Sequence, residues 1–187
     1  PLVSKACIYF DDEIGINSYL KYWQELKKNK ITIAYLSPTM AKALINYSKY
    51  NILKSKNKNI RIISTGSFLY PNILKEFYKI FKIKLINCYG VTEIGASIGL
   101  AHKNIHNLVG KISNGVSIKL SNKNEILVKS KFSFEGYISD KNTIKKFNSE
   151  YFNTHDLAKK YNHEYFIVGR NKEIIKRMYD VVEKDYN

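Results

Sequence analysis

Two hydrophobic periods alternate over roughly the first hundred residues of the chain. Short β-prone apolar runs are separated by longer stretches in which apolar residues recur at helical spacing. The apolar runs predict strands at residues 6–10, 31–36, 60–64 and 84–88, and the stretches predict helices at 16–29, 38–50 and 71–81. Ser37 and Pro38 suit an N-cap and a first helical position. Strands and helices in alternation are typical of a parallel sheet, in which ligands bind at the carboxyl ends of the strands.

The pattern changes after Gly99. Short apolar runs at 116–120, 125–128 and 165–168 are separated by Gly, Asn and Ser, which predicts antiparallel strands in a small barrel or roll. The predicted fold class is therefore α/β, a partial parallel sheet with flanking helices followed by a small antiparallel β-barrel or roll. We expect an α/β subdomain at residues 1–100 and an antiparallel β subdomain at 101–168. Residues 169–187 are expected to form a separate third segment.

Composition narrows the class of protein. The chain has 187 residues, of which 44% are hydrophobic and 13% aromatic, so it can bury a core and is not disordered. No apolar run approaches the ~18 residues that a membrane span needs. Cys7 and Cys88 lie in apolar, strand-like runs, which favours core packing in a reducing cytoplasm over a disulfide or a metal site. Pro1 opens the chain without an initiator Met or a signal pattern, so we expect a segment of a longer cytoplasmic protein.

The formal net charge of +15 would favour contact with phosphate groups. However, 28 of the 31 basic residues are Lys, and the three arginines are Arg61, Arg170 and Arg177. The lysines are scattered, and no recognisable nucleic-acid module accompanies them. A solvated basic surface is the preferred interpretation, so no nucleic-acid partner is expected, and a nucleic-acid-binding domain is kept as an alternative.

Chemistry-bearing residues recur in a fixed order along the chain. Taken singly, each stretch has ordinary turn chemistry. Together they supply an aromatic ring for a base, an acid for a metal, an acid for a sugar diol and a cation for phosphate. The stretches are Ser64-Thr65-Gly66-Ser67, Tyr89-Gly90-Val91-Thr92-Glu93, Leu108-Val109-Gly110-Lys111, Glu125-Ile126-Leu127-Val128, Gly136-Tyr137, Thr154-His155-Asp156 and Gly169-Arg170-Asn171-Lys172.

In this order and spacing the stretches resemble the adenylate-forming superfamily of acyl- and aryl-CoA synthetases, peptide-synthetase adenylation domains and luciferases. The resemblance covers residues 1–176. It implies an enzyme that activates a carboxylic acid with ATP to an acyl-adenylate, with Mg²⁺ at the phosphates. The acyl group then passes to a thiol, either CoA or the phosphopantetheine of an acyl carrier protein.

The resemblance also implies roles for individual residues at the adenine and phosphates. Tyr89 would stack on adenine beside Gly90, Thr92 would hydrogen-bond the α-phosphate, and Glu93 would help to hold Mg²⁺. Gly66 and Ser67 would border the adenine and the acyl group.

Further roles follow for the ribose, the hinge and the acid pocket. Asp156 would accept both ribose hydroxyls, and Arg170 would reach the ribose or phosphate. Lys172 would be the hinge before a small C-terminal domain. The side chain of the acid would be read by Cys88, Ala96 and Ser97.

Two departures from the family pattern stand out. Thr65 and His155 occupy positions where the family has glycine, which costs little if φ stays negative there. The resemblance also places the phosphate loop before Pro1 and the catalytic lysine in a further domain, so we expect the chain alone to be inactive. The preferred reading is a fragment of an AMP-forming acid–thiol ligase that uses CoA. The alternatives are an adenylation domain that loads a carrier protein, and a non-catalytic remnant that acts as a binding module.

Overall fold

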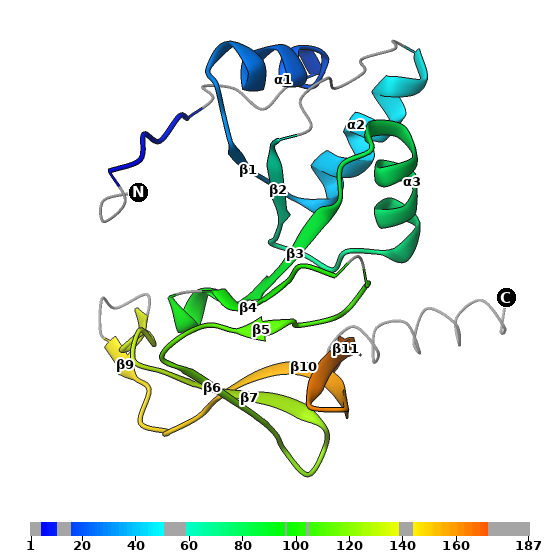
Figure 1. Cartoon of the computed structure of the whole chain (residues 1–187). Helices are drawn as coiled ribbons and strands as arrows, with labels where there is room; N and C mark the ends of the chain where they lie inside the picture. Colours follow the sequence, from blue (N-terminus) through cyan, green and yellow to red (C-terminus); the bar gives the residue numbers. More distant parts are fainter. Residues whose placement is uncertain are drawn as a thin grey trace, which may run out of the picture. The chain divides into compact units, whose positions relative to one another are not determined.

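In the computed structural model the chain forms two compact units, residues 1–86 and residues 87–187 (Figure 1). The structure describes residues 5–10, 16–50, 59–95, 97–103, 105–138 and 144–171. The predictions for Ala96, for Lys172 and for the rest of the segment after Asn171 lie outside the described residues. Each unit is described by itself below.

The first unit contains the predicted alternation of helices and strands. Its elements are α1 (Ile16–Lys28), β1 (Ile33–Leu36), α2 (Pro38–Tyr50), β2 (Arg61–Ser64) and α3 (Pro71–Phe81). Strands β1 and β2 pair in parallel, as expected for a βαβ crossover. Ser37 caps α2 as predicted, because its Oγ accepts a hydrogen bond from the amide of Met40 at 3.2 Å.

Helices α1, α2 and α3 pack around one core, in which α1 and α3 supply aromatic rings. Phe77 of α3 is fully buried, and its ring centroid lies 6.3 Å from that of Trp23 and 4.7 Å from that of Phe81. Aliphatic residues of β1, α2 and β2 pack into the same cluster. The helical periodicity seen in the sequence therefore marks the faces that meet in this core.

Strand β3 (Leu85–Gly90) begins at the end of the first unit and continues into the second. The second unit adds η1 (Thr92–Ile94), β4 (Ser97–Ala101), β5 (Lys111–Ile112), β6 (Val116–Leu120), β7 (Glu125–Ser130), β8 (Gly136–Ile138), β9 (Ile144–Lys146), β10 (Phe152–Tyr161) and β11 (Glu164–Arg170). Within the second unit β4 pairs antiparallel with β3, and β5 pairs antiparallel with β4. A curved antiparallel sheet has the order β11-β10-β7-β6. The predicted fold class is confirmed.

One predicted strand is wrong. Residues 6–10 form no strand in the structure, and Cys7 is exposed rather than packed in a core. Phe10 in the same run is 79% exposed. An apolar run shows that a segment can pair, but a strand also needs a neighbour, and none pairs with this run in the described part of the chain. Cys88 lies half-buried on β3.

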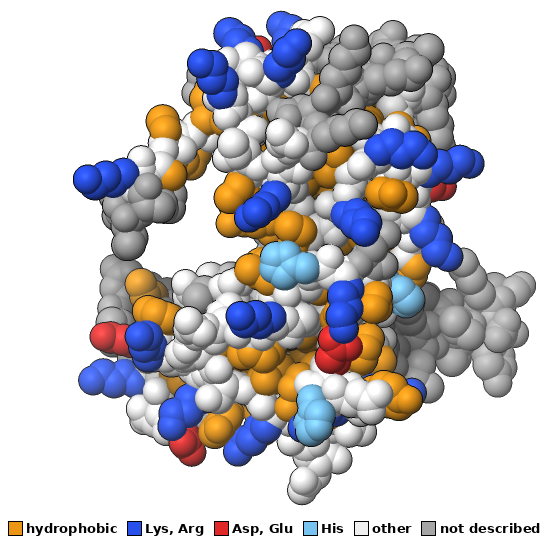
Figure 2. Space-filling model, viewed as in Figure 1, with side chains coloured by type: hydrophobic (Ala, Val, Ile, Leu, Met, Phe, Trp, Pro, Cys, Tyr) orange, Lys and Arg blue, Asp and Glu red, His pale blue; other side chains and the backbone are white. Residues whose placement is uncertain are grey.

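Two surface properties bear on possible partners. None of the helices that the structure describes is long and apolar enough to cross a membrane. Lys and Arg side chains are spread over the face shown in Figure 2 and do not gather in one stripe. The high positive charge is therefore distributed over the visible face.

Candidate nucleotide site in the second unit

The candidate site is built on an irregularity in β10. Asn153 of β10 pairs with Leu127 of β7, and Leu157 pairs with Glu125, so the chain advances four residues on β10 for two on β7. The additional residues form a bulge, which bends a strand and redirects its side chains. We call residues 153–157 the β10 bulge, and Asp156 lies within it. Thr154, Asp156 and Ala158 stay on the buried side of β10, and Asp156 keeps its pairing with Arg170 of β11.

Two side chains flank the Asp156 carboxylate. The Tyr89 hydroxyl donates a hydrogen bond to Oδ2 at 2.7 Å, and Nε of Arg170 lies 3.4 Å from Oδ1. Asp156 and Arg170 are also paired residues of β10 and β11. Tyr89 belongs to β3, so strands distant in sequence meet at this acid. Arg170 keeps about half of its side chain exposed (51%), while that of Asp156 is 12% exposed.

Tyr89 reaches the site from inside the core of the second unit. The residue is only 8% exposed and packs in a cluster with Ile94, Ile98 and Val109. Burial, and next the nearby Asp156 charge, raise the pKa of Tyr89 far above its usual value. The hydroxyl therefore remains protonated at any ordinary pH and acts as a donor to Asp156.

Thr154 ties the bulge to β7 and to Tyr89 of β3. Its Oγ1 donates to the carbonyl of Ile126 at 3.1 Å and lies 3.2 Å from the oxygen of the Tyr89 hydroxyl, whose proton is donated to Asp156. The Thr154 Oγ1 also accepts from the amide of Asp156 at 3.2 Å. Since Thr154 is almost fully buried, these contacts satisfy backbone groups that the bulge removes from the ladder. Thr154 thus fixes the backbone of the acid beside it.

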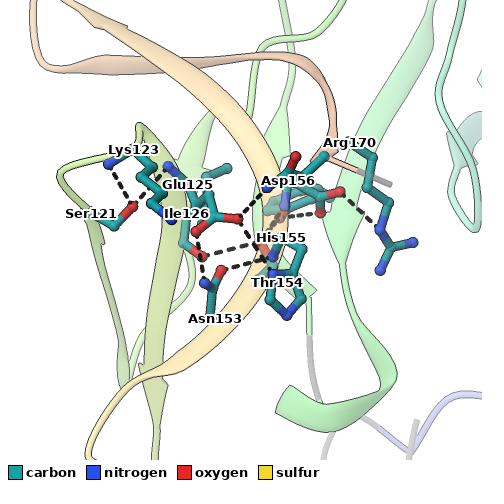
Figure 3. A network of polar contacts seen from close by, with 11 residues as sticks. Ser121, Lys123, Glu125, Ile126, Asn153, Thr154, His155, Asp156 and Arg170 are labelled. Carbon is teal, nitrogen blue, oxygen red and sulfur yellow. Dashed lines mark hydrogen bonds and ion pairs between the residues drawn. The ribbon is translucent and has the colours of Figure 1, made fainter. Parts of the chain in front are cut away.

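Glu125 supports the bulge from β7, as Figure 3 shows. Its buried carboxylate accepts from the side-chain amides of Asn153 at 2.9 Å and Asn171 at 3.1 Å. Nδ1 of His155 lies 3.4 Å from Oε1. The amide of Asn153 comes first among the causes that lower the pKa of Glu125, followed by that of Asn171, and burial opposes them. Glu125 is therefore an ionised acceptor at neutral pH.

His155 corrects one expectation. Its φ is 59°, so its backbone is left-handed. A residue other than glycine would cost little here only with a negative φ, so the expectation of a low cost is wrong. This left-handed conformation strains a residue that carries a Cβ. Thr65 is not among the described residues with positive φ, and the expectation holds there.

The strain at His155 can be measured. We expect His155→Gly to be about 1 kcal/mol more stable than His155→Ala, because only the alanine keeps a Cβ in the left-handed region. Both variants lose the imidazole, so the comparison isolates the backbone. Urea unfolding of the two variants checks this, and equal midpoints would contradict the assignment of strain to this residue.

The second predicted acid, Glu93, lies in η1 at the end of β3. Its Oε1 accepts a hydrogen bond from the Tyr137 hydroxyl of β8 at 2.8 Å, and this bond raises the pKa of Tyr137. The Glu93 carbonyl accepts from the amide of Phe134 at 2.8 Å. Thr92, one residue earlier, is exposed. The turn after β3 thus presents a hydroxyl and an oriented carboxylate.

The remaining predicted residues fall in both units. Cys88 and Gly90 lie on β3, and Ser97 faces Gly90 in the register of β4. Gly66 has a φ of +92° and lies with Ser67 in the turn after β2, in the first unit. Of the predicted residues, Tyr89 and Arg170 are the two that contact the Asp156 carboxylate in the second unit.

Sequence reasoning gave Glu125, Tyr137 and Asn171 only as parts of the family pattern, without a role, and it gave no role to Asn153. One signal was present, because a charged residue opens the otherwise apolar run at 125–128. Glu is almost never fully buried unless it is paired, so a Glu within a core strand points to donors around it. The pattern could not say which residues supply those donors.

The sequence matches the model of a known protein family. The sequence model of the family described as AMP-binding enzyme matches residues 3–138. The acetyl-coenzyme A synthetase of Mesorhizobium japonicum is 24% identical over 100 residues, which are 51% of this chain and 15% of that protein. The chain therefore spans a small part of the curated relative that it matches.

Solved structures show the same fold. The anthranilate CoA ligase AuaEII in complex with anthranoyl-AMP aligns with a TM-score of 0.70 at 18% identity, over 88% of this chain and 34% of that one. The adenylation domain of a keto acid-selecting NRPS module aligns with a TM-score of 0.69 at 13% identity, over 84% of this chain and 39% of that one. The fold and the match over more than half of the sequence define the class, that of adenylate-forming ligases. The chain belongs to the AMP-binding enzyme family.

Proposed function

We propose that this chain is the part of a cytoplasmic AMP-forming acid–thiol ligase that holds the nucleoside of ATP. The parent enzyme activates a carboxylic acid to an acyl-adenylate and transfers the acyl group to CoA. The observation that supports this most directly is the Asp156 carboxylate, held at the β10 bulge between Tyr89 and Arg170. The chain alone, about a third of the length of the solved structures it resembles, is expected to be inactive in the full reaction.

The chemistry of these groups suits a ribose and its phosphate. An ionised carboxylate only accepts hydrogen bonds, which matches the two donors of a vicinal diol. Arg170 adds a cation beside it with a half-exposed guanidinium, which suits phosphate oxygens. The pairing of β10 with β11 sets the two side chains next to each other before any ligand binds, which lowers the ordering cost of binding.

The turn after β3 fits a magnesium ion by its donor set. Glu93 offers carboxylate oxygen and Thr92 a hydroxyl, and Mg²⁺ is commonly held by one or two carboxylates together with substrate phosphates. The ion would supply charge neutralisation at the phosphates. Tyr137 orients the Glu93 carboxylate through its hydrogen bond to Oε1.

Three further assignments carried by the resemblance stay predictions. Stacking of adenine on Tyr89 requires an open ring face, and a residue that is 8% exposed offers little of its ring. The Tyr89 hydroxyl, in contrast, donates a hydrogen bond to the Asp156 carboxylate. Reading of the acid by Cys88 and Ser97 and a border of Gly66 and Ser67 along the nucleotide are likewise untested.

The acceptor could also be a carrier protein. The net charge of +15 would complement an acidic carrier, and the keto acid-selecting NRPS adenylation domain has the same fold. Transfer assays on the full-length parent with CoA and with a phosphopantetheinylated carrier distinguish the two. A non-catalytic remnant predicts that the parent does not exchange pyrophosphate into ATP.

Calorimetric titration of the chain with AMP and Mg²⁺ tests the proposed site. We expect Asp156→Asn to weaken AMP binding about tenfold or more, because charge-assisted hydrogen bonds to the ribose hydroxyls are lost. Glu164→Gln is the matched control, since it removes an acid that pairs with Lys103 on the surface. Equal affinities for wild type and Asp156→Asn would contradict the assignment of Asp156 to the ribose.

A further inference from the structure

We infer that Glu125 is a positioning residue of the nucleotide site, which holds the β10 bulge in the shape that presents Asp156. This inference rests on the proposed function, because its consequence for ligand binding runs through Asp156. It concerns a residue that does not itself face the Asp156 carboxylate. Glu125 instead acts through the amide of Asn153.

The first step is a relay of two hydrogen bonds. Asn153 donates from Nδ2 to Oε2 of Glu125 at 2.9 Å, and Oδ1 of the same amide accepts from the backbone amide of His155 at 2.8 Å. An asparagine amide has a donor end and an acceptor end, and it can be turned either way. An ionised carboxylate only accepts, so it selects the orientation in which the Asn153 oxygen faces the His155 amide. Glu125 thereby determines how the bulge is closed.

The second step links the same carboxylate to the neighbouring strand. Asn171, which directly follows Arg170, donates to Oε1 of Glu125 at 3.1 Å. His155 lies beside the same oxygen at 3.4 Å. The buried Glu125 carboxylate therefore contacts the side chain that precedes Asp156 in the sequence and the one that follows Arg170. Asp156 and Arg170, which are assigned to the ribose and phosphate, thus both adjoin residues that contact the Glu125 carboxylate.

The third step separates this role from that of an ordinary strand residue. The backbone of Glu125 makes its own bonds, because its carbonyl accepts from the amide of Ser121 at 2.9 Å and its amide donates to the Ser121 hydroxyl at 3.1 Å. These bonds do not need the carboxylate. Burial of a charge is costly unless donors surround it, and an apolar residue would fill the same position without that cost. The role of the carboxylate is therefore to orient the side chains that donate to it.

Exchange of the donor and the acceptor tests the relay. Glu125→Gln has one acceptor for two asparagine amides, and Asn153→Asp places two carboxylates against each other. In the double variant Glu125→Gln/Asn153→Asp, the new amide of residue 125 donates to the new carboxylate of residue 153. Its oxygen still accepts from Asn171, and the carboxylate still accepts from the His155 amide. Glu164→Gln is the control for loss of an acid elsewhere on the second unit.

Two readouts are measured on the full chain. Calorimetry with AMP and Mg²⁺ gives the affinity, and NMR-detected hydrogen exchange gives the protection of the His155 amide. We expect each single variant to weaken AMP binding about fivefold and to speed exchange at His155 about tenfold. The double variant should return the affinity to within about twofold of wild type, because its donors and acceptors again match.

The outcomes separate the inference from the proposed function. If Asp156→Asn abolishes AMP binding while Glu125→Gln changes neither readout, the inference is wrong and the proposed function stands. If both single variants lose binding and the double variant does not recover it, Glu125 is only a structural residue and the inference is again wrong. If wild type binds no AMP, the proposed nucleotide site fails in this chain, and exchange at His155 in the single and double variants still decides whether the relay exists.

Discussion

Gly110→Ala will lower the free energy of unfolding of the second unit by about 3 kcal/mol, because it combines backbone strain with a steric clash. Gly110 has a φ of +81°. A Cβ built on it would lie 2.2 Å from the carbonyl oxygen of Leu100 and 2.5 Å from Cα of Ala101. These are backbone atoms of β4, so the clash is relieved only if β4 moves away from the segment that leads into β5.

Gly115→Ala provides a matched control for this prediction. Its φ is +80°, but the atoms nearest to a new Cβ belong to the flexible side chain of Lys131, at 3.0 Å and beyond. We expect this variant to lose only the backbone term, about 1 kcal/mol. Guanidinium unfolding followed by circular dichroism compares the two. Equal losses would mean that close packing against β4 does not constrain Gly110.

The consequence of the Gly110 substitution extends toward the site. Val109, directly before Gly110, is fully buried and belongs to the cluster that encloses Tyr89. Its amide donates to the carbonyl of Tyr165 at 2.9 Å, which connects this segment to β11. We therefore expect a displacement at Gly110 to shift the strands that carry Tyr89 and Arg170. Sequence reasoning noted the stretch at 108–111 only as part of the resemblance and not as a close approach of two backbones.

The sequence predicted the helices well because each buries one face. The helical spacing of apolar residues in 16–29 and 71–81 reports burial on one side, and the observed α1 and α3 follow it closely. Strands were less certain, because an apolar run carries no information about its partner. Residues 6–10 have the composition of a strand and form none.

The candidate site also depends on strand pairing that the sequence pattern does not reveal. Asp156 and Arg170 were found through a resemblance in their order, and the structure places them on paired residues of β10 and β11. The stretch Asn153–Asp156 has turn chemistry, yet it lies inside a ten-residue strand, because side chains take over the hydrogen bonds that the ladder loses there. Local composition favours a turn, and only the pairing with β7 and β11 makes it a bulge.

Phe77→Ala is expected to destabilise the first unit by about 3–5 kcal/mol. Phe77 is fully buried on α3, and its ring lies against those of Trp23 and Phe81. Removal of the ring leaves a cavity among elements that are already closely packed, and neighbouring rings can fill it only partly. Trp23 is the single tryptophan of the chain, so its fluorescence reports unfolding of this core directly.

Tyr78→Ala on the same helix is the control for this change. Tyr78 is 41% exposed, and its ring makes a distant contact with the Lys82 ammonium at 6.0 Å. Truncation of this ring removes a comparable volume from the surface and should cost less than about 1 kcal/mol. If both variants lose the same stability, the packing of Phe77 contributes no more than helix propensity does. If only Phe77→Ala is strongly destabilised, the difference is the contribution that burial of this ring makes to the stability of the first unit.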